Sequence, residues 1–248
     1  ENFNKLTNEI FKQMVELSVI HMSQDCGFGY LHVDTWIEYV NASMPSLAVP
    51  ILNQIALLSE TAPGLSINIL ANDHRAGDPE FTKEMFDKVN GTQLVHLALH
   101  DLLFSEGDRH HGNVHIDEDG TLMLIDNDSA LGVQYGTNFW GRLRGIDSAF
   151  LPGTERHGIC SRHKTVRVLD YRCYVEGGKI GLNYPPQLVQ CMENIVNSTP
   201  EELRLKYLIP RQDQAELLRF RAREMLQLGF EDALASALED ERIKYEYQ

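Results

Sequence analysis

The chain has 248 residues, of which 43% are hydrophobic and 23% are charged. This composition is ordinary for a globular protein, and the length allows one large domain or two small ones. With 36 acidic residues against 22 Lys and Arg, the formal net charge is −14. Such a charge disfavours nucleic acids and anionic membranes as primary partners. No apolar run has the length of a membrane-spanning helix.

The first half of the chain predicts helices and loops. Residues 3–22 place apolar side chains on one face at helical spacing, which is typical of an amphipathic helix. Residues 26–33 predict a short strand or turn broken by glycines. Residues 34–60 predict two helices, the first capped by its initial aspartate and the two divided by prolines. Segments 61–66 and 72–80 are rich in Gly, Pro and Asp and predict loops.

Further along, residues 80–104 predict a helix that is interrupted at Asn90-Gly91 and is strongly apolar in its second part. Two short strands, Val114–Ile116 and Thr121–Ile125, flank the turn sequence DEDG and predict a buried hairpin. Residues 185–248 again have helical periodicity. The expected fold class is therefore α+β and mainly helical, with a short internal β-hairpin.

The sequence contains four cysteines, Cys26, Cys160, Cys173 and Cys191. Their spacing excludes a CxxC zinc ribbon and leaves two interpretations open: buried free thiols, or one or two disulfides formed in an oxidising compartment. Three Asn-x-Ser/Thr triplets, at Asn41, Asn90 and Asn197, are compatible with a secreted glycoprotein. The first residues lack the order of a signal peptide and no initiator Met is present, so we expect a mature, processed or partial chain.

A polar loop with the sequence GDRHHGN, residues 107–113, separates the apolar helix from the hairpin. Asn113 follows Asp108 at plus five, and Asp126 follows it at plus eighteen, directly after the apolar run LMLI. Phosphoryl transfer needs one carboxylate to orient the acceptor hydroxyl, and an amide and a second carboxylate to hold metal ions that neutralise the phosphates. This spacing therefore predicts a phosphoryl-transfer site that uses ATP with Mg²⁺ or Mn²⁺.

The motif GDRHHGN…LIDND resembles the atypical kinases. Phosphatidylinositol kinases carry D-R-H-x-x-N and then an I-D hairpin end, and the actin-fragmin kinase has a related loop after a helix similar to LALHDLLF. Secretory-pathway kinases of the Golgi casein kinase and xylosylkinase type carry D-R-H-H and then D-N-G, and Asp126-Asn127 is similar to the latter. The stretch 160–169 and the Cys191 helix are also similar to this type, whose helical lobe is disulfide-bonded. The resemblance covers residues 92–195 and is sharpest over 107–132.

By this resemblance, the catalytic residues are Asp108, Arg109 and His110. Asp108 would be the catalytic acid or base, and Arg109 and His110 would brace the loop by hydrogen bonds. His111 is a lesser candidate for the bracing role.

The same resemblance implies that Asn113 and Asp126 bind the cofactor, ATP, through its metal ion. Asp128 would be a third metal ligand or the sign of an altered site, because the Golgi type has Gly at that position. The Golgi type also has Glu where Asn113 stands, whereas the lipid kinases and common protein kinases have Asn.

The resemblance implies that residues 1–248 form a kinase-like C-terminal lobe, with the catalytic loop and metal-binding hairpin at 107–132 and helices at 185–248. A small ATP-covering lobe is not evident, because no G-x-G-x-x-G occurs. The function expected is phosphorylation of a protein Ser/Thr or a glycan hydroxyl, in the secretory pathway or outside the cell. The alternatives are a catalytically inactive lobe serving as a subunit of a larger assembly, a phosphoinositide kinase, and an intracellular location.

Three other features have alternative interpretations. His110, His111 and His115 with Asp108 form an alternative zinc site. The DEDG segment has some likeness to a calcium loop, although a hairpin turn explains it more simply. The basic run Arg162, His163, Lys164, Arg167 and Arg172 is either an attractor of phosphates or acidic substrates, or a solvated strand edge.

Overall fold

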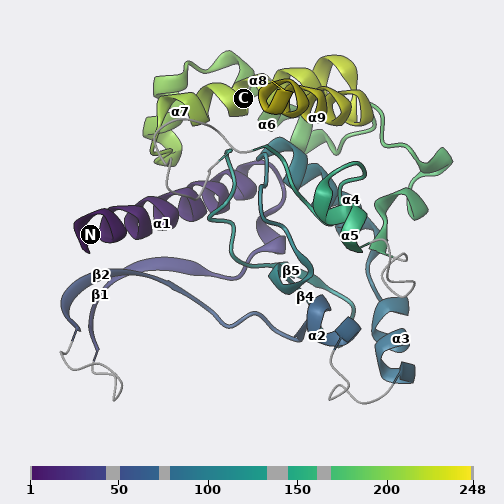
Figure 1. The fold of residues 1–248 in the computed structure, drawn as a ribbon, viewed down its shortest axis with the longest axis horizontal. Coiled ribbons are helices and arrows are strands. Elements are labelled where there is room, and N and C mark those ends of the chain that lie inside the picture. The colour runs from purple at the N-terminus through teal and green to yellow at the C-terminus, as the bar shows by residue number, and fades with distance from the viewer. Residues whose placement is uncertain (1, 43–50, 73–78, 133–144, 161–168, 247–248) are drawn as a thin grey trace.

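The chain is α+β and mainly helical, as the sequence predicts (Figure 1). A computed structural model describes residues 2–42, 51–72, 79–132, 145–160 and 169–246. Within these residues the α-helices are α1 (Asn2–Asp25), α2 (Ile67–Asn72), α3 (Pro79–Asp87), α4 (Gly91–Leu103), α5 (Glu155–Cys160), α6 (Pro186–Asn197), α7 (Pro200–Tyr207), α8 (Gln212–Leu228) and α9 (Phe230–Glu246). The strands are β1 (Thr35–Ala42), β2 (Ile51–Ser59), β3 (Leu65–Ser66), β4 (Val114–Ile116) and β5 (Leu122–Leu124).

The C-terminal helices α6–α9 gather at one end of the molecule, and α1 lies between them and the ribbon of β1 and β2 (Figure 1). Helix α8 is the centre of this group, because it contacts α4, α6, α7 and α9. Its residues Leu218, Ala222 and Met225 recur at helical spacing and are completely buried. The predicted helices of residues 185–248 are thus present up to Glu246.

The predicted break at Asn90 is an N-cap. The side chain of Asn90 accepts hydrogen bonds from the backbone N–H groups of Thr92 and Gln93, at 3.0 and 3.3 Å. These bonds satisfy donors that the first turn of α4 would otherwise leave unpaired. Helix α4 is then buried over most of its length, as its apolar sequence predicts. A rigid, buried helix therefore leads into the polar loop at 107–113.

The predicted hairpin is also present, as strands β4 and β5 of a three-stranded antiparallel sheet in the order β3-β4-β5. In its turn, the Asp117 carboxylate accepts the N–H groups of Asp119 and Thr121 at 3.0 and 2.8 Å. Gly120 has φ +82°, and a Cβ atom there would lie 1.9 Å from the Lys88 carbonyl oxygen. The turn therefore uses the Asp117 carboxylate to fold the hairpin, which is the simpler of the two interpretations of DEDG.

The prediction of two helices over residues 34–60 is wrong. Strands β1 and β2 form an antiparallel ribbon there, with Thr35 opposite Ser59 and an irregularity between Val40 and Ala42. Single-sequence periodicity does not separate short apolar helices from strands, and the β-branched and aromatic residues of TWIEYV favour the strand. The pairing of two segments supplies the deciding hydrogen bonds, and no local pattern reports it. The predicted loop 72–80 lies largely outside the described residues.

A disulfide between Cys26 and Cys191 joins the C-terminal end of α1 to α6. Of the two interpretations of the cysteines, this bond confirms the one with a disulfide. Cys173 is an exposed free thiol. Beside the disulfide, the Asp25 carboxylate accepts hydrogen bonds from Lys206 and Tyr207 of α7, at 2.7 and 2.8 Å. Over the described residues, no helix is both long and apolar enough to cross a membrane.

Replacing both cysteines, Cys26→Ser with Cys191→Ser, is expected to lower the free energy of unfolding by about 2–5 kcal/mol, because the bond constrains the unfolded chain. The bridged residues are 165 positions apart, so the constrained loop is long. Urea denaturation measures the loss, with Cys173→Ser as the matched control that leaves stability unchanged. A double variant as stable as the wild type would show that the bond adds nothing.

Candidate functional site

The loop that carries Asp108 is organised around Arg109, whose side chain is completely buried. Its Nε donates to the Asp101 carboxylate at 3.2 Å, and its Nη2 to the Glu106 carboxylate at 3.4 Å. Its Nη1 donates to the Ile125 carbonyl at 2.9 Å, and Nη2 to Asn127 Oδ1 at 2.5 Å. One guanidinium therefore joins the end of α4, the polar loop and the segment after β5. This is the bracing role that the sequence predicts for Arg109.

The acids around Arg109 are held in different charge states. Burial raises the pKa of Glu106 to about 8, although Arg109 opposes this shift. Burial acts in the same direction on Asp101, but Arg109 and His100 outweigh it and hold the pKa of Asp101 below its ordinary value. Asp101 is therefore the charged partner of Arg109 at neutral pH.

Asp108 lies at the surface of this network and is partly exposed. Its N–H donates to Glu106 at 3.0 Å, and its carbonyl oxygen accepts from the side-chain amide of Asn113 at 3.2 Å. Its carboxylate accepts a hydrogen bond from Arg156 of α5. The amide of Asn113 thus donates through Nδ2, which leaves Oδ1 as the acceptor atom that a cation needs.

The two histidines of the loop have structural roles. The Nδ1 atom of His110 accepts the Gly112 N–H at 2.9 Å and caps the 3-10 helix η2 (His111–Asn113). The ring of His111 is buried and packs edge-on against Phe150, with 5.9 Å between ring centroids. His110 therefore braces the loop by a hydrogen bond, as predicted.

Asp126 follows β5 in the left-handed region, with φ 57°, a conformation that Asp adopts more readily than most residues. Its side chain is accessible at the tip, yet the surrounding protein removes enough solvent to raise its pKa. The negative charge of Asp128 raises the pKa further, and that of Asp108 adds to it. Lys12 and Arg109 act in the opposite direction. Asp108 and Asp126 therefore belong to one electrostatic site.

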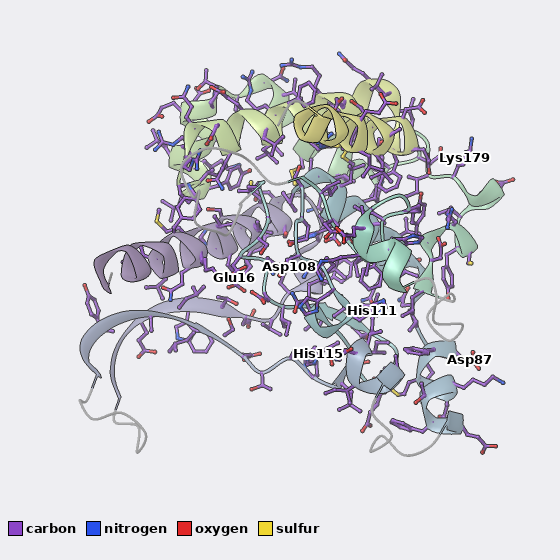
Figure 2. The ribbon with its side chains drawn as sticks, viewed as in Figure 1. Glu16, Asp87, Asp108, His111, His115 and Lys179 are labelled. Carbon is purple, nitrogen blue, oxygen red and sulfur yellow. A yellow bond between two sulfur atoms is a disulfide. The ribbon has the colours of Figure 1, made fainter. Side chains whose placement is uncertain are left out.

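Helix α1 adds two residues that sequence reasoning missed. Lys12 forms an ion pair with Asp128 at 3.1 Å. Glu16, one turn further along, has its pKa raised to about 7 by burial and then by Asp126 and Asp128. In Figure 2, Glu16 and Asp108 are both labelled near the centre of the view. These contacts join residues more than a hundred positions apart, so no local motif signals them.

The arrangement of ligands excludes a preformed metal cage from the described part of the chain. Over these residues, no group of three or more His, Cys, Asp or Glu side chains is placed to hold a metal ion. The alternative zinc site is not assembled among the described residues. His115 lies in β4 opposite Met123, whereas His110 uses its Nδ1 atom to accept the Gly112 N–H. Asp128, a predicted metal ligand, is instead engaged by Lys12 and Ser129.

The remaining donors nevertheless fit a metal ion that arrives with phosphates. Mg²⁺ is commonly bound through one or two carboxylates together with substrate phosphates, and it keeps several waters. Asp126, Glu16 and Asn113 offer oxygen atoms of this kind. Burial, and then the charges of neighbouring acids, raise the pKa values of Asp126 and Glu16, so this region disfavours carboxylate charge, a condition that a cation relieves.

The basic run divides between described and undescribed residues. Arg162, His163, Lys164 and Arg167 lie outside the described residues, as does most of the stretch 160–169. Arg172 is described, and its Nε and Nη2 donate to the Asp170 carboxylate at 2.9 and 2.5 Å. This local ion pair accounts for Arg172 without a ligand.

A comparison of the chain with protein-family models finds no family that matches, and a search of curated proteins finds no match either. We therefore infer the function from the geometry of the site.

Replacing Arg109 with Met is expected to lower the free energy of unfolding by about 3–5 kcal/mol, because the charged carboxylate of Asp101 would remain buried without its cation. Urea denaturation at neutral pH measures the change. Arg172→Met removes an exposed arginine from a similar two-point contact and should cost less than about 1 kcal/mol. Equal losses in the two variants would contradict the central role of Arg109.

His32 predicts a pH dependence of stability. Its ring is buried, with Nε2 3.0 Å from Ser23 Oγ and Nδ1 3.4 Å from Asn127 Nδ2. Burial, with smaller contributions from His100 and Arg109, holds the pKa of His32 well below its ordinary value. Because the unfolded state binds this proton more readily, the stability is complete above about pH 6.5 and is lost as the pH falls below it.

His32→Asn is therefore expected to reduce the loss of stability between pH 6.5 and 5 by up to about 1.4 kcal/mol per pH unit. The raised pKa values of Glu106 and Glu16 contribute the opposite slope to both proteins, so the difference between variant and wild type isolates His32. Denaturation series at several pH values give that difference. Parallel curves for the two proteins would exclude the titration of His32.

Proposed function

We propose that the protein is an atypical kinase that transfers the terminal phosphoryl group of ATP to a hydroxyl of a protein Ser or Thr or of a glycan. One observation carries the proposal: the Arg109 network holds the Asp108 loop and the Asp126 segment together, so that the two carboxylates share one acidic site. The spacing of GDRHHGN and LIDND in the sequence agrees with this arrangement.

In this function, Asp108 orients the acceptor hydroxyl and takes its proton, since its carboxylate is partly exposed at the end of a rigid loop. Asp126 and Asn113, joined by Glu16 of α1, would hold a Mg²⁺ or Mn²⁺ ion that accompanies ATP. The ion supplies neutralisation of the phosphate charge. Arg109 and His110 act through the loop and keep Asp108 in place.

Helix α1 has the role of a small-lobe helix in this proposal. In kinases, a helix of the small lobe brings a glutamate to the nucleotide site, where it pairs with a lysine. Helix α1 brings Glu16 to the acids that follow β5, and Lys12 of the same helix pairs with Asp128. We assign to α1 the role of this small-lobe helix. The sequence motifs do not reveal this element of an ATP-covering lobe.

A second function is favoured by a specific observation. Asp108 and Asp128 are both engaged by cations of the chain itself, Arg156 and Lys12. A lobe in which such pairs persist would be catalytically inactive and would serve as a binding subunit of a larger assembly. The disulfide supports an oxidising compartment, in the secretory pathway or outside the cell, for either function.

Nucleotide binding separates the two functions. ATP with Mn²⁺ at a hundred times its dissociation constant should stabilise an active kinase by about 2.7 kcal/mol, which raises the melting temperature by several degrees. Asp126→Asn should abolish the shift and any ATP turnover. Asn suits the left-handed conformation of position 126, so this variant should fold.

The matched control is Asp87→Asn, which removes the same charge from an exposed position on α3 far from the site (Figure 2). It should behave as the wild type. Mn²⁺ alone should give little stabilisation, because the described residues form no cage of three ligands. A wild-type protein that shows no metal-dependent shift with ATP would favour the inactive subunit.

A further inference from the structure

Arg156 connects the proposed catalytic loop to a second acidic segment. Its guanidinium donates through Nη2 to the Asp108 carboxylate, and its Nε lies 3.3 Å from the Asp147 carboxylate. Its backbone N–H also donates to Asp147, at 2.9 Å. The side chain is 27% exposed, so the guanidinium lies between the buried network and solvent.

The position of Arg156 is fixed by the same network that holds Asp108. The backbone N–H of Asp147 donates to the Glu106 carbonyl at 2.8 Å, and that of Ala149 donates to the Arg109 carbonyl at 2.8 Å. Between them, the Ser148 hydroxyl donates to the Asp101 carboxylate at 2.6 Å. The backbone of Asp147 is therefore held in place, and Arg156 contacts the Asp147 carboxylate by its backbone N–H and by an ion pair.

Arg156 differs from the other basic side chains near Asp108 in being open to a ligand. Arg109 is completely buried, and its Nε, Nη1 and Nη2 all donate within the protein. Lys12 is paired with Asp128. Among the described residues, Arg156 is the basic side chain that is both in contact with Asp108 and open to solvent.

We propose that Arg156 is a catalytic residue of the kinase proposed above, and that its guanidinium binds the phosphoryl group in transfer. In the free protein it neutralises Asp108. When ATP and the acceptor are bound, its Nη atoms donate to the oxygens of the terminal phosphoryl group while Asp147 retains Nε. Asp108 is then released to accept a hydrogen bond from the acceptor hydroxyl.

The transfer step is balanced in these terms. The acceptor O–H bond breaks and its proton passes to the Asp108 carboxylate. A bond forms between the acceptor oxygen and the terminal phosphorus, while the bond from that phosphorus to the bridging oxygen breaks and ADP leaves with the electron pair. Charge spreads over the three equatorial oxygens during transfer, and a guanidinium with planar paired donors is suited to them.

This assignment predicts differential binding. An interaction made mainly in the transition state raises the rate without tightening the binding of the ground-state nucleotide. Arg156→Ala should therefore lower the rate constant of ATP turnover by roughly 10²–10³-fold, the loss typical of one such donor. The affinity for ADP should change little.

The test uses the transition-state analogue formed by ADP, Mg²⁺ and aluminium fluoride, because it needs no identified acceptor. The affinities of the full chain for Mg²⁺–ADP with and without aluminium fluoride are measured by calorimetry, for the wild type, Arg156→Ala and Arg156→Lys. The wild type should bind the analogue more tightly than ADP, and Arg156→Ala should lose that gain. Arg156→Lys should recover part of it, since Lys keeps the charge but lacks the planar pair of donors.

The control is Arg172→Ala, which breaks an exposed ion pair with Asp170 and should retain the whole gain. If Arg156→Ala does not fold, Arg156→Lys carries the comparison by itself. An Arg156 variant that binds the analogue as tightly as the wild type would overturn the assignment and leave the arginine as a cover for Asp108. Equal weakening of ADP and analogue would also overturn it. A wild type that binds neither nucleotide overturns the proposed kinase function itself.

Discussion

The buried guanidinium of Arg109 is the constraint on which the arrangement of the site depends. Its four contacts reach the end of α4, Glu106 just before the polar loop, and the segment after β5, which lies 16 to 18 residues further along the chain. A buried cation is costly unless each donor is satisfied, so these segments have little freedom to separate. Backbone hydrogen bonds from residues 147 and 149 add a fourth segment to the same frame. The solvent-accessible carboxylates of Asp108 and Asp126 thereby acquire fixed positions.

This frame explains why an acidic site exists in a protein that is already strongly acidic. Burial raises the pKa values of Asp126 and Glu16, and repulsion from neighbouring acids, Asp128 among them, raises both further. The energy that holds them comes from the buried core and the Arg109 network, and no contact among the acids themselves supplies it. Such stored repulsion is typical of sites that bind cations or cationic complexes.

The features that could be predicted from the sequence are those set by local chemistry. The cap at Asn90, the apolar helix after it and the turn at Asp117 each depend on residues within a few positions of one another. The bracing role of Arg109 and His110 was expected from the resemblance of the motif to atypical kinases. The ribbon over residues 34–60 was beyond this reasoning, because strand pairing is decided by a partner segment. The same holds for Glu16 and Arg156, which enter the site from helices whose own sequences carry no signal of it.

The disulfide at the end of α1 limits how Glu16 can move relative to the acidic site. Cys26 is covalently anchored to α6, while Glu16 lies ten residues away along the same helix. At 1.5 Å per residue this is a lever arm of about 15 Å. A pivot of roughly 10° about the anchored end would carry Glu16 through about 2.6 Å, more than the ~2.1 Å length of a Mg²⁺–oxygen bond. The covalent tether thus opposes a sliding motion that would draw the whole helix away from the loop.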